Sequence, residues 1–299
     1  MAAPAPDNSP SSGRDALLGI GFVLVWCTGY IAGKVAVAHA APLTSLTLRF
    51  GIAALVFGAL ALIGRVGRCR RVDLLHSAAT GVLMLALHFG AVYVAFQWGA
   101  NAGVSALVIG AMPLLVALVA TLDGSERLGA WRWFGMALGL LGVALVVADR
   151  VDGATPLKAW AMLALGLVGI TAGTLYQKRH AAHLDMRLGL TVQNAAATLV
   201  LLPFALLEGF RFDDSAAFHG ALAWLVLVNS IGGFALLFLL IRRGAATRVA
   251  ALFFLMPPVT AVFGHLTLGE HLTWLKGAGF ACAAIGVWLA TRSEAPRAA

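Results

Sequence analysis

Long apolar segments alternate with short polar ones along almost the whole chain. A helix that crosses the hydrocarbon core of a bilayer needs about 20 mainly apolar residues. By this measure the sequence predicts ten membrane-spanning helices, separated by polar or turn-forming residues. We place them at residues 15–38, 43–64, 73–97, 101–122, 131–148, 157–177, 187–208, 218–241, 247–268 and 271–291.

The pattern also repeats at a fixed offset. The segment that begins at Met112 matches, without a gap, the segment that begins 144 residues later at Met256. The aligned pairs include Pro113 and Pro257, Glu126 and Glu270, Gly135 and Gly279, and Gly142 and Gly286. Apolar matches carry little information in such a chain, but a Met-Pro pair, a glutamate and two glycines at one offset indicate a duplication.

The duplication divides the chain into two repeats of five helices, at residues 15–148 and 157–291. Residues 1–14, rich in Pro, Ser and Ala, are expected to be a disordered tail, and residues 292–299 form a second tail. An odd number of spans places the second copy upside down in the membrane. The predicted fold is an all-α polytopic membrane protein with two inverted five-helix repeats, a plan typical of secondary transporters.

Composition and charge support this interpretation. Of 299 residues, 61% are hydrophobic and only 11% are charged, against about 25% charged in soluble domains. Fifteen of the 21 Lys and Arg residues fall on one side of the predicted topology. Because basic residues concentrate in cytoplasmic loops, both termini are expected in the cytoplasm. The net charge of +8 is therefore a topology signal rather than a nucleic-acid site.

Several of these residues together resemble a known family. They are the segment Trp26–Lys34, Arg49, the two Met-Pro pairs, and Gly269-Glu270 with its counterpart Ser125-Glu126. The chain resembles the ten-helix, EamA-type exporters of the drug/metabolite transporter superfamily, and is most similar to bacterial amino-acid exporters, including aromatic ones. The resemblance implies a multi-pass inner-membrane protein that acts on a small molecule, as a monomer or weak dimer. The first repeat departs from the pattern, with Ser125 where glycine is usual.

Polar side chains inside spans are the first candidates for transport, because a bilayer tolerates them at a cost. Lys34 and Arg49, near the outer ends of spans one and two, could attract a substrate carboxylate. The alternatives are snorkelling to the head groups for Lys34 and a structural partner for Arg49. His88, Tyr93 and Gln97 are spaced to share one face of span three, which suits a wet cavity better than a lipid contact. Hydrogen bonding between helices is the alternative for these residues.

Further candidates come from later spans. Asn229 is predicted at mid-membrane in span eight. Aromatic side chains suit the wall of a cavity for a flat or apolar solute, and helix packing or an interfacial belt is the alternative. The aromatic candidates are Trp26, Tyr30, Trp160, Tyr176 and Phe253. Pro113 and Pro257 interrupt spans four and nine at matching points, which indicates hinges or simple kinks.

The sequence also bears on cofactors and energy. We expect no cofactor and no metal, since the pair His180 and His183 has no acidic third ligand nearby. A phosphate-binding G-x-x-x-x-G-K-[ST] loop is lacking from the sequence, which argues against ATP hydrolysis by this chain. No acidic residue is predicted at mid-membrane, so facilitated transport or exchange is favoured, with His88 or His265 as the possible proton carriers.

These observations predict a carrier that exports amino acids, possibly aromatic, or similar metabolites by alternating access. Its small-molecule substrate and the bilayer are the expected partners. The alternative within transport is a drug or nucleoside-type exporter. An intramembrane enzyme is a remote alternative, because the spans offer no H-E-x-x-H motif, no buried Asp pair and no Ser-His pair at helical spacing. A membrane scaffold without a pore is equally remote.

Overall fold

The computed structural model describes residues 13–67, 69–122, 129–148, 155–181, 183–242 and 255–291. Every extended regular element in these residues is a helix, and one isolated antiparallel bridge joins Ala40 to Phe212. The elements are α1 (Gly13–His39), α2 (Pro42–Ile63), α3 (Arg71–Gly81), the π-helical η1 (Val82–Leu87), α4 (His88–Gln97), α5 (Ala102–Gly110), α6 (Met112–Leu122), α7 (Ala130–Ala148), α8 (Leu157–His180), α9 (Met186–Leu207), α10 (Ala216–Ala223), the π-helical η2 (Trp224–Gly232), α11 (Gly233–Arg242), α13 (Met256–Leu268) and α14 (Trp274–Thr291).

Across the described residues these elements form ten rods, in agreement with the ten predicted spans. The rods at residues 71–97 and 216–242 each consist of two α-helices joined by a π-helical stretch, and α5 and α6 together form one rod that is interrupted at Ala111. Within the described ranges, five helices are long and apolar enough to cross a membrane: Leu17–His39, Pro42–Ile63, Arg71–Gln97, Leu157–His180 and Met186–Leu207. Shorter apolar helices cover Ala102–Val116, Trp133–Val146 and Ala216–Gly232.

The bounds of the helices carry the same offset of 144 residues as the sequence. Shifting α2, Pro42–Ile63, by that offset gives the bounds of α9, Met186–Leu207. In the same way α6 and α13 begin at Met112 and Met256, and α7 and α14 begin at Ala130 and Trp274. The duplicated landmarks therefore mark a duplicated arrangement of helices.

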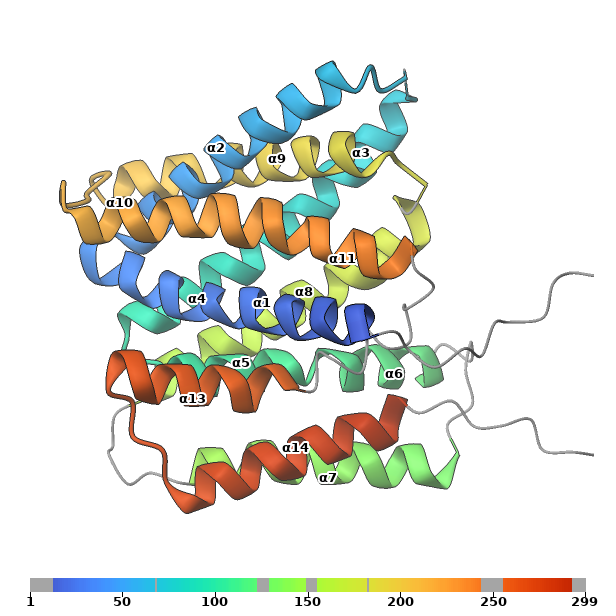
Figure 1. Ribbon diagram of the computed structural model, residues 1–299, viewed down its shortest axis with the longest axis vertical. Coiled ribbons are helices and arrows are strands. Elements are labelled where there is room, and N and C mark those ends of the chain that lie inside the picture. Colours follow the sequence, from blue (N-terminus) through green and yellow to red (C-terminus); the bar gives the residue numbers. More distant parts are fainter. Residues whose placement is uncertain are drawn as a thin grey trace, which may run out of the picture.

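Equivalent helices of the two repeats also pack against each other. In Figure 1, α2 lies beside α9 and α7 lies beside α14, and the two members of each pair run in opposite directions. Glycines bring the backbones of α7 and α14 together: a Cβ at Gly286 would lie 2.2 Å from the Gly139 nitrogen. Close approach at small residues is a common way for helices to associate in membranes.

The outward faces of the helices are apolar. Leu55 and Leu62 on α2 are 75% and 81% exposed, and Leu199 and Leu207 on α9 are 71% and 84% exposed. Such surface is unfavourable in water and suits contact with lipid chains. The described helices thus have the surface expected of a membrane protein, while their polar side chains lie mainly between helices.

Candidate transport site

The turn between α13 and α14 positions an acidic side chain among the helices. Gly269 ends α13 in the left-handed conformation, with φ of 66°, which glycine adopts without a steric penalty. The Glu270 amide then donates to the Gly264 carbonyl over 3.1 Å. A Cβ at Gly264 would lie 2.5 Å from Glu270 Oε2, so glycine leaves room for the carboxylate. Because this turn continues to Thr273, α14 begins at Trp274, three residues later than predicted.

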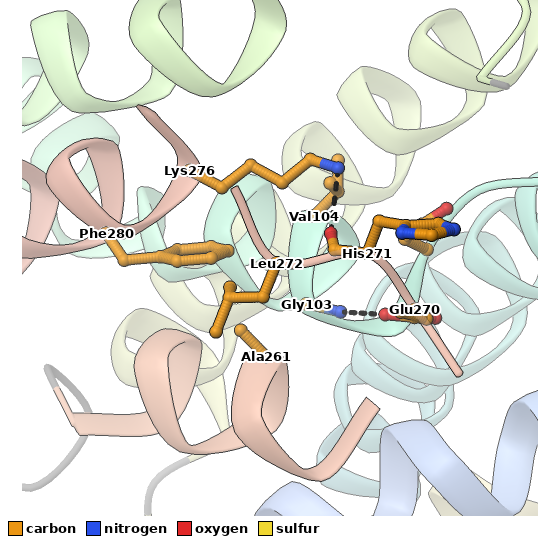
Figure 2. Close-up of a pocket in the computed structure, with 9 residues that line it drawn as sticks. Gly103, Val104, Ala261, Glu270, His271, Leu272, Lys276 and Phe280 are labelled. Carbon is orange, nitrogen blue, oxygen red and sulfur yellow. Dashed lines mark hydrogen bonds between the residues drawn. The ribbon is translucent and has the colours of Figure 1, made fainter. Parts of the chain in front are cut away.

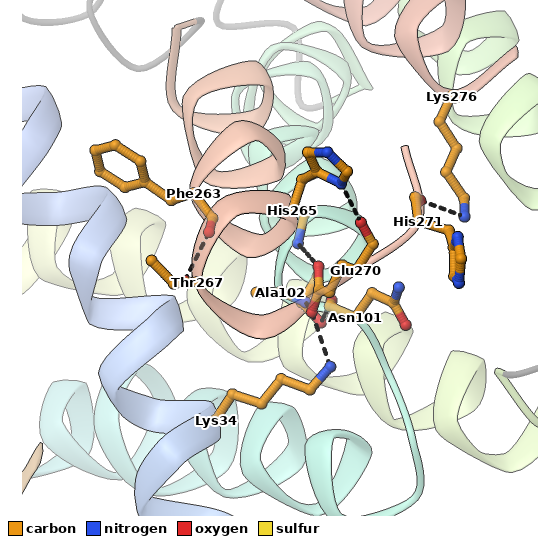
Figure 3. Close-up of polar contacts among 11 residues, drawn as sticks. Lys34, Asn101, Ala102, Phe263, His265, Thr267, Glu270, His271 and Lys276 are labelled. Carbon is orange, nitrogen blue, oxygen red and sulfur yellow. Dashed lines mark hydrogen bonds and ion pairs between the residues drawn. The ribbon is translucent and has the colours of Figure 1, made fainter. Parts of the chain in front are cut away.

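The Glu270 carboxylate joins the two repeats. It accepts hydrogen bonds from the Ala102 amide at 2.7 Å and the Gly103 amide at 3.3 Å, at the start of α5. Lys34 Nζ on α1 lies 2.8 Å from Glu270 Oε1. Figure 3 shows the two side chains pointing toward each other. The amides at a helix start lack partners within the helix and favour a negative charge. We call this end of the bundle, where α1 ends and α5 begins, the Glu270 end.

A small pocket adjoins the carboxylate. Figure 2 shows that it lies between the start of α5, the middle of α13 and the segment from Glu270 into the first half of α14. Lys276, which is 8% exposed, donates to the His271 carbonyl at 3.0 Å beside this pocket. Its lining residues are Asn101, Gly103, Val104, Ala261, Glu270, His271, Leu272, Lys276 and Phe280. Acidic, basic and apolar groups therefore meet at the Glu270 end.

A second cluster surrounds Arg49 between α1, α2 and α4. The Arg49 side chain is buried, and its Nη1 donates to the Tyr93 hydroxyl at 3.3 Å. Its Cζ lies 4.8 Å from the ring centroid of Phe89 and 5.5 Å from that of Phe50. A Cβ at Gly33 on α1 would lie 2.8 Å from the Tyr93 hydroxyl, so α1 closes the cluster on that side. The structure thus brings together two predicted site residues, Arg49 and Tyr93.

Two other predicted polar residues are buried at helix contacts. His88 is 4% exposed, and its Nδ1 lies 2.9 Å from the Gly166 carbonyl of α8. Asn229 in η2 donates to the Val25 carbonyl of α1 at 2.6 Å. Its Nδ2 would lie 2.9 Å from a Cβ at Gly29, so the amide fills the space that this glycine leaves.

The remaining predicted residues are dispersed. Trp26 packs at the contact of α1 with α13, whereas Tyr30 and Trp160 pack against the main apolar core. Gln97 is exposed at the end of α4. Tyr176 lies near the end of α8, where its hydroxyl is 2.8 Å from His76 Nδ1. It is therefore not part of the cluster around Arg49 and Tyr93. Phe253 lies outside the described residues.

The two candidate hinge prolines lie at helix starts. Pro113 is the second residue of α6, and only Ala111 separates α5 from α6. Pro257 is likewise the second residue of α13, which begins directly after Leu255. A proline costs little there, because the amide it lacks would have no partner within the helix.

Sequence reasoning did not select Glu270, Phe50 or Phe89 as site residues. The signal for Glu270 was present in its alignment with Glu126 and in the glycine before it. Phe50 and Phe89 gave no signal, since apolar aromatic residues are common in every span. Among the described residues no group of three His, Cys, Asp or Glu side chains is arranged to hold a metal ion.

Comparison of the sequence with known protein families finds a match to the EamA-like transporter family. The model of the EamA-like transporter family matches twice, at residues 14–148 and 157–292. A protein of Escherichia coli K12 named "Probable amino-acid metabolite efflux pump" is 25% identical over 93% of this chain and 95% of its own length. Its namesake in Salmonella typhimurium is 26% identical over the same shares of the two chains.

Two further similarities extend this result. The "Uncharacterized inner membrane transporter YedA" of Escherichia coli K12 is 25% identical over 85% of this chain and 82% of its own length. A solved structure titled "Crystal structure of protein" superposes with a TM-score of 0.67 at 17% identity, covering 94% of this chain and 97% of that one. The latter likeness concerns the fold alone.

Proposed function

Because the chain belongs to the EamA-like transporter family, we propose that it exports amino acids or similar small metabolites across the bacterial inner membrane by alternating access. The relatives named as amino-acid metabolite efflux pumps, which match over nearly their whole length, favour this class of substrate. The duplicated helices supply two halves that can move against each other.

The contact between Lys34 and Glu270 carries the proposal. It joins α1 in the first repeat to the α13–α14 turn in the second, at one end of the bundle. The carboxylate is only 8% exposed, so the contact is shielded from water on one side. In an alternating-access carrier the two halves must meet at one end while they part at the other. We therefore assign this ion pair as the closure of the Glu270 end.

The repeat suggests a matching closure at the opposite end. Lys34 is equivalent to Lys178, and Glu270 is equivalent to Glu126, which lies outside the described residues. If the repeats are inverted, Lys178 and Glu126 would meet when Lys34 and Glu270 part. The concentration of Lys and Arg on one side of the predicted topology supports an orientation with the Glu270 end outside and both termini in the cytoplasm.

Counterflow into proteoliposomes tests this function. The purified chain is reconstituted with unlabelled phenylalanine, threonine or a cationic dye inside, and uptake of the same labelled solute is followed. We expect accumulation of at least one amino acid, against none in protein-free vesicles. Movement of the dye without either amino acid would replace the proposal with a drug exporter, and no movement of any solute would remove it.

A further inference from the structure

A buried cation without an acidic partner stands between α1, α2 and α4. Arg49 is 7% exposed, and it forms no ion pair within the part of the chain that the structure describes. Its Nε is fully buried without a hydrogen-bond acceptor. A guanidinium has five N–H donors, yet among the described residues the one oxygen that Arg49 reaches is the Tyr93 hydroxyl. The Nε donor in particular has no acceptor among the described residues.

The aromatic neighbours do not compensate for this burial. The rings of Phe89 and Phe50 lie within cation–π distance of the guanidinium. Such cation–π contacts recover only part of the free energy that is lost when a guanidinium is removed from water. The environment therefore favours an added anion at Arg49.

The second repeat shows that a five-helix repeat can fold without this charge. The position equivalent to Arg49 is Gln193 on α9, and the bounds of α2 and α9 differ by the repeat offset. Gln193 is as deeply buried as Arg49, at 7% exposed. A neutral amide thus occupies the same place in the same kind of helix. The charge at Arg49 belongs to the first repeat alone, which points to a use other than packing.

A second buried polar group lies on the same face of α2. Ser45 is one turn before Arg49 and is fully buried, and its Oγ has no hydrogen-bond partner. Residues four apart share a helix face, and helical side chains lean toward the start of the helix. Arg49 and Ser45 can therefore offer donors to one ligand.

From these contacts we propose that Arg49 binds the carboxylate of the exported solute, with the rings of Phe50, Phe89 and Tyr93 packing against its apolar or aromatic side chain. A guanidinium donates two parallel hydrogen bonds to a carboxylate, and aromatic faces suit a flat solute. The inference rests on the proposed export function and narrows it to solutes that carry a carboxylate.

The place of the site fits the closure described above. Gly33, which touches the Tyr93 hydroxyl, directly precedes Lys34 in α1. The ion pair with Glu270 thus lies next to the Arg49 cluster along the same helix. A solute approaching from the Glu270 end meets the closed pair before it meets Arg49.

Phenylalanine and its amide distinguish this proposal from a structural role. The two probes share the ring and the amine, but phenylalaninamide lacks the carboxylate. Binding of each to the full-length protein in detergent, and counterflow of each in proteoliposomes, are compared for wild type, Arg49→Gln, Arg49→Lys and Lys158→Gln. Glutamine reproduces the residue of the second repeat, and Lys158→Gln removes an exposed positive charge elsewhere.

We expect wild type to prefer phenylalanine to its amide, and Arg49→Gln to bind phenylalanine about 30-fold or more weakly, in line with the loss of one partner of a buried charge pair. The preference should vanish in Arg49→Gln, recover in part in Arg49→Lys and persist in Lys158→Gln. Unchanged discrimination in a monodisperse Arg49→Gln protein overturns the proposal, while wild-type flux of phenylalanine still supports export. Absence of wild-type flux for both probes, together with no movement of threonine or the dye, counts against the export function itself.

Discussion

Lys34 Nζ lies 2.8 Å from Glu270 Oε1, although 236 residues separate the two in the sequence. The same carboxylate oxygen accepts a hydrogen bond from the Ala102 amide at the start of α5. Glu270 therefore connects α1 and α5 of the first repeat with the α13–α14 turn of the second. Replacing Lys34 leaves the hydrogen bonds from the α5 amides to Glu270 in place. The ion pair can therefore be tested separately from these hydrogen bonds.

Breaking the ion pair should open the Glu270 end. A hydrogen bond to a charged group contributes about 1.5–3 kcal/mol, so Lys34→Met should raise the population of the open form about 10- to 100-fold. Ser105 on α5 is fully buried and offers a probe position for a cysteine. In a background without Cys27, Cys69 and Cys282, Ser105→Cys should react faster with an impermeant thiol reagent once Lys34 is replaced.

Two variants control this experiment. Glu270→Gln removes the charge and keeps an acceptor for the α5 amides, so it should also speed labelling. Lys34→Arg retains a cation and should leave the labelling rate near that of the parent. Equal rates in Lys34→Met and in the parent would show that the pair does not close this end.

The close contact of α7 with α14 should tolerate no side chain at Gly286. A Cβ there would lie 2.2 Å from the Gly139 nitrogen and 2.6 Å from the Gly135 carbonyl oxygen, and backbone atoms cannot move aside cheaply. Gly286→Ala should lower the free energy of unfolding by about 1–3 kcal/mol, as overpacking does.

Gly277 provides the matched control on the same helix, since a Cβ at that position meets no atom within 4 Å. Thermal unfolding in detergent compares the two variants. A Gly286→Ala protein as stable as Gly277→Ala would contradict the packing of α7 and α14.

The break between α5 and α6 should matter for transport. Pro113 has no amide hydrogen to donate to Ile109, so α5 cannot continue regularly through Ala111. Pro113→Ala restores that donor and should stiffen the rod, which lowers counterflow several-fold while the protein remains folded. Pro203→Ala is the control, because Pro203 lies inside α9, which continues past it. Equal flux in both variants would leave Pro113 as a simple kink.

Acid should loosen the loop before α10. The hydrogen bond from the Ser215 hydroxyl, followed by that with His39, lowers the pKa of Asp213. A carboxyl with a lowered folded pKa stabilises the fold above its unfolded pKa of about 3.9, and this contribution is lost as the pH falls through the folded value. The melting temperature of the wild type should exceed that of Asp213→Asn at pH 5, and the difference should vanish in stronger acid. A margin that persists at pH 2 would exclude the Asp213 charge as its source.

Part of the site was visible in the sequence. The spacing of His88 and Tyr93 placed both on α4 inside the bundle, and the intramembrane position of Arg49 marked it as a candidate. Gln97 shared the predicted face but ends up exposed, because α4 ends there. The spacing of residues along a helix does not show where that helix ends or where it stops packing against neighbouring helices.

The sequence by itself determined the ten helices and the duplication. The length of each apolar segment can be read locally along the chain, and so can the Met112-Pro113 pair and its counterpart Met256-Pro257. Only the tertiary structure decided which polar groups meet. It paired Lys34 with Glu270, turned Arg49 toward Tyr93 and placed Tyr176 beside His76. These contacts depend on which faces neighbouring helices turn toward each other, and packing sets those faces between residues that lie 44 to 236 positions apart in the chain.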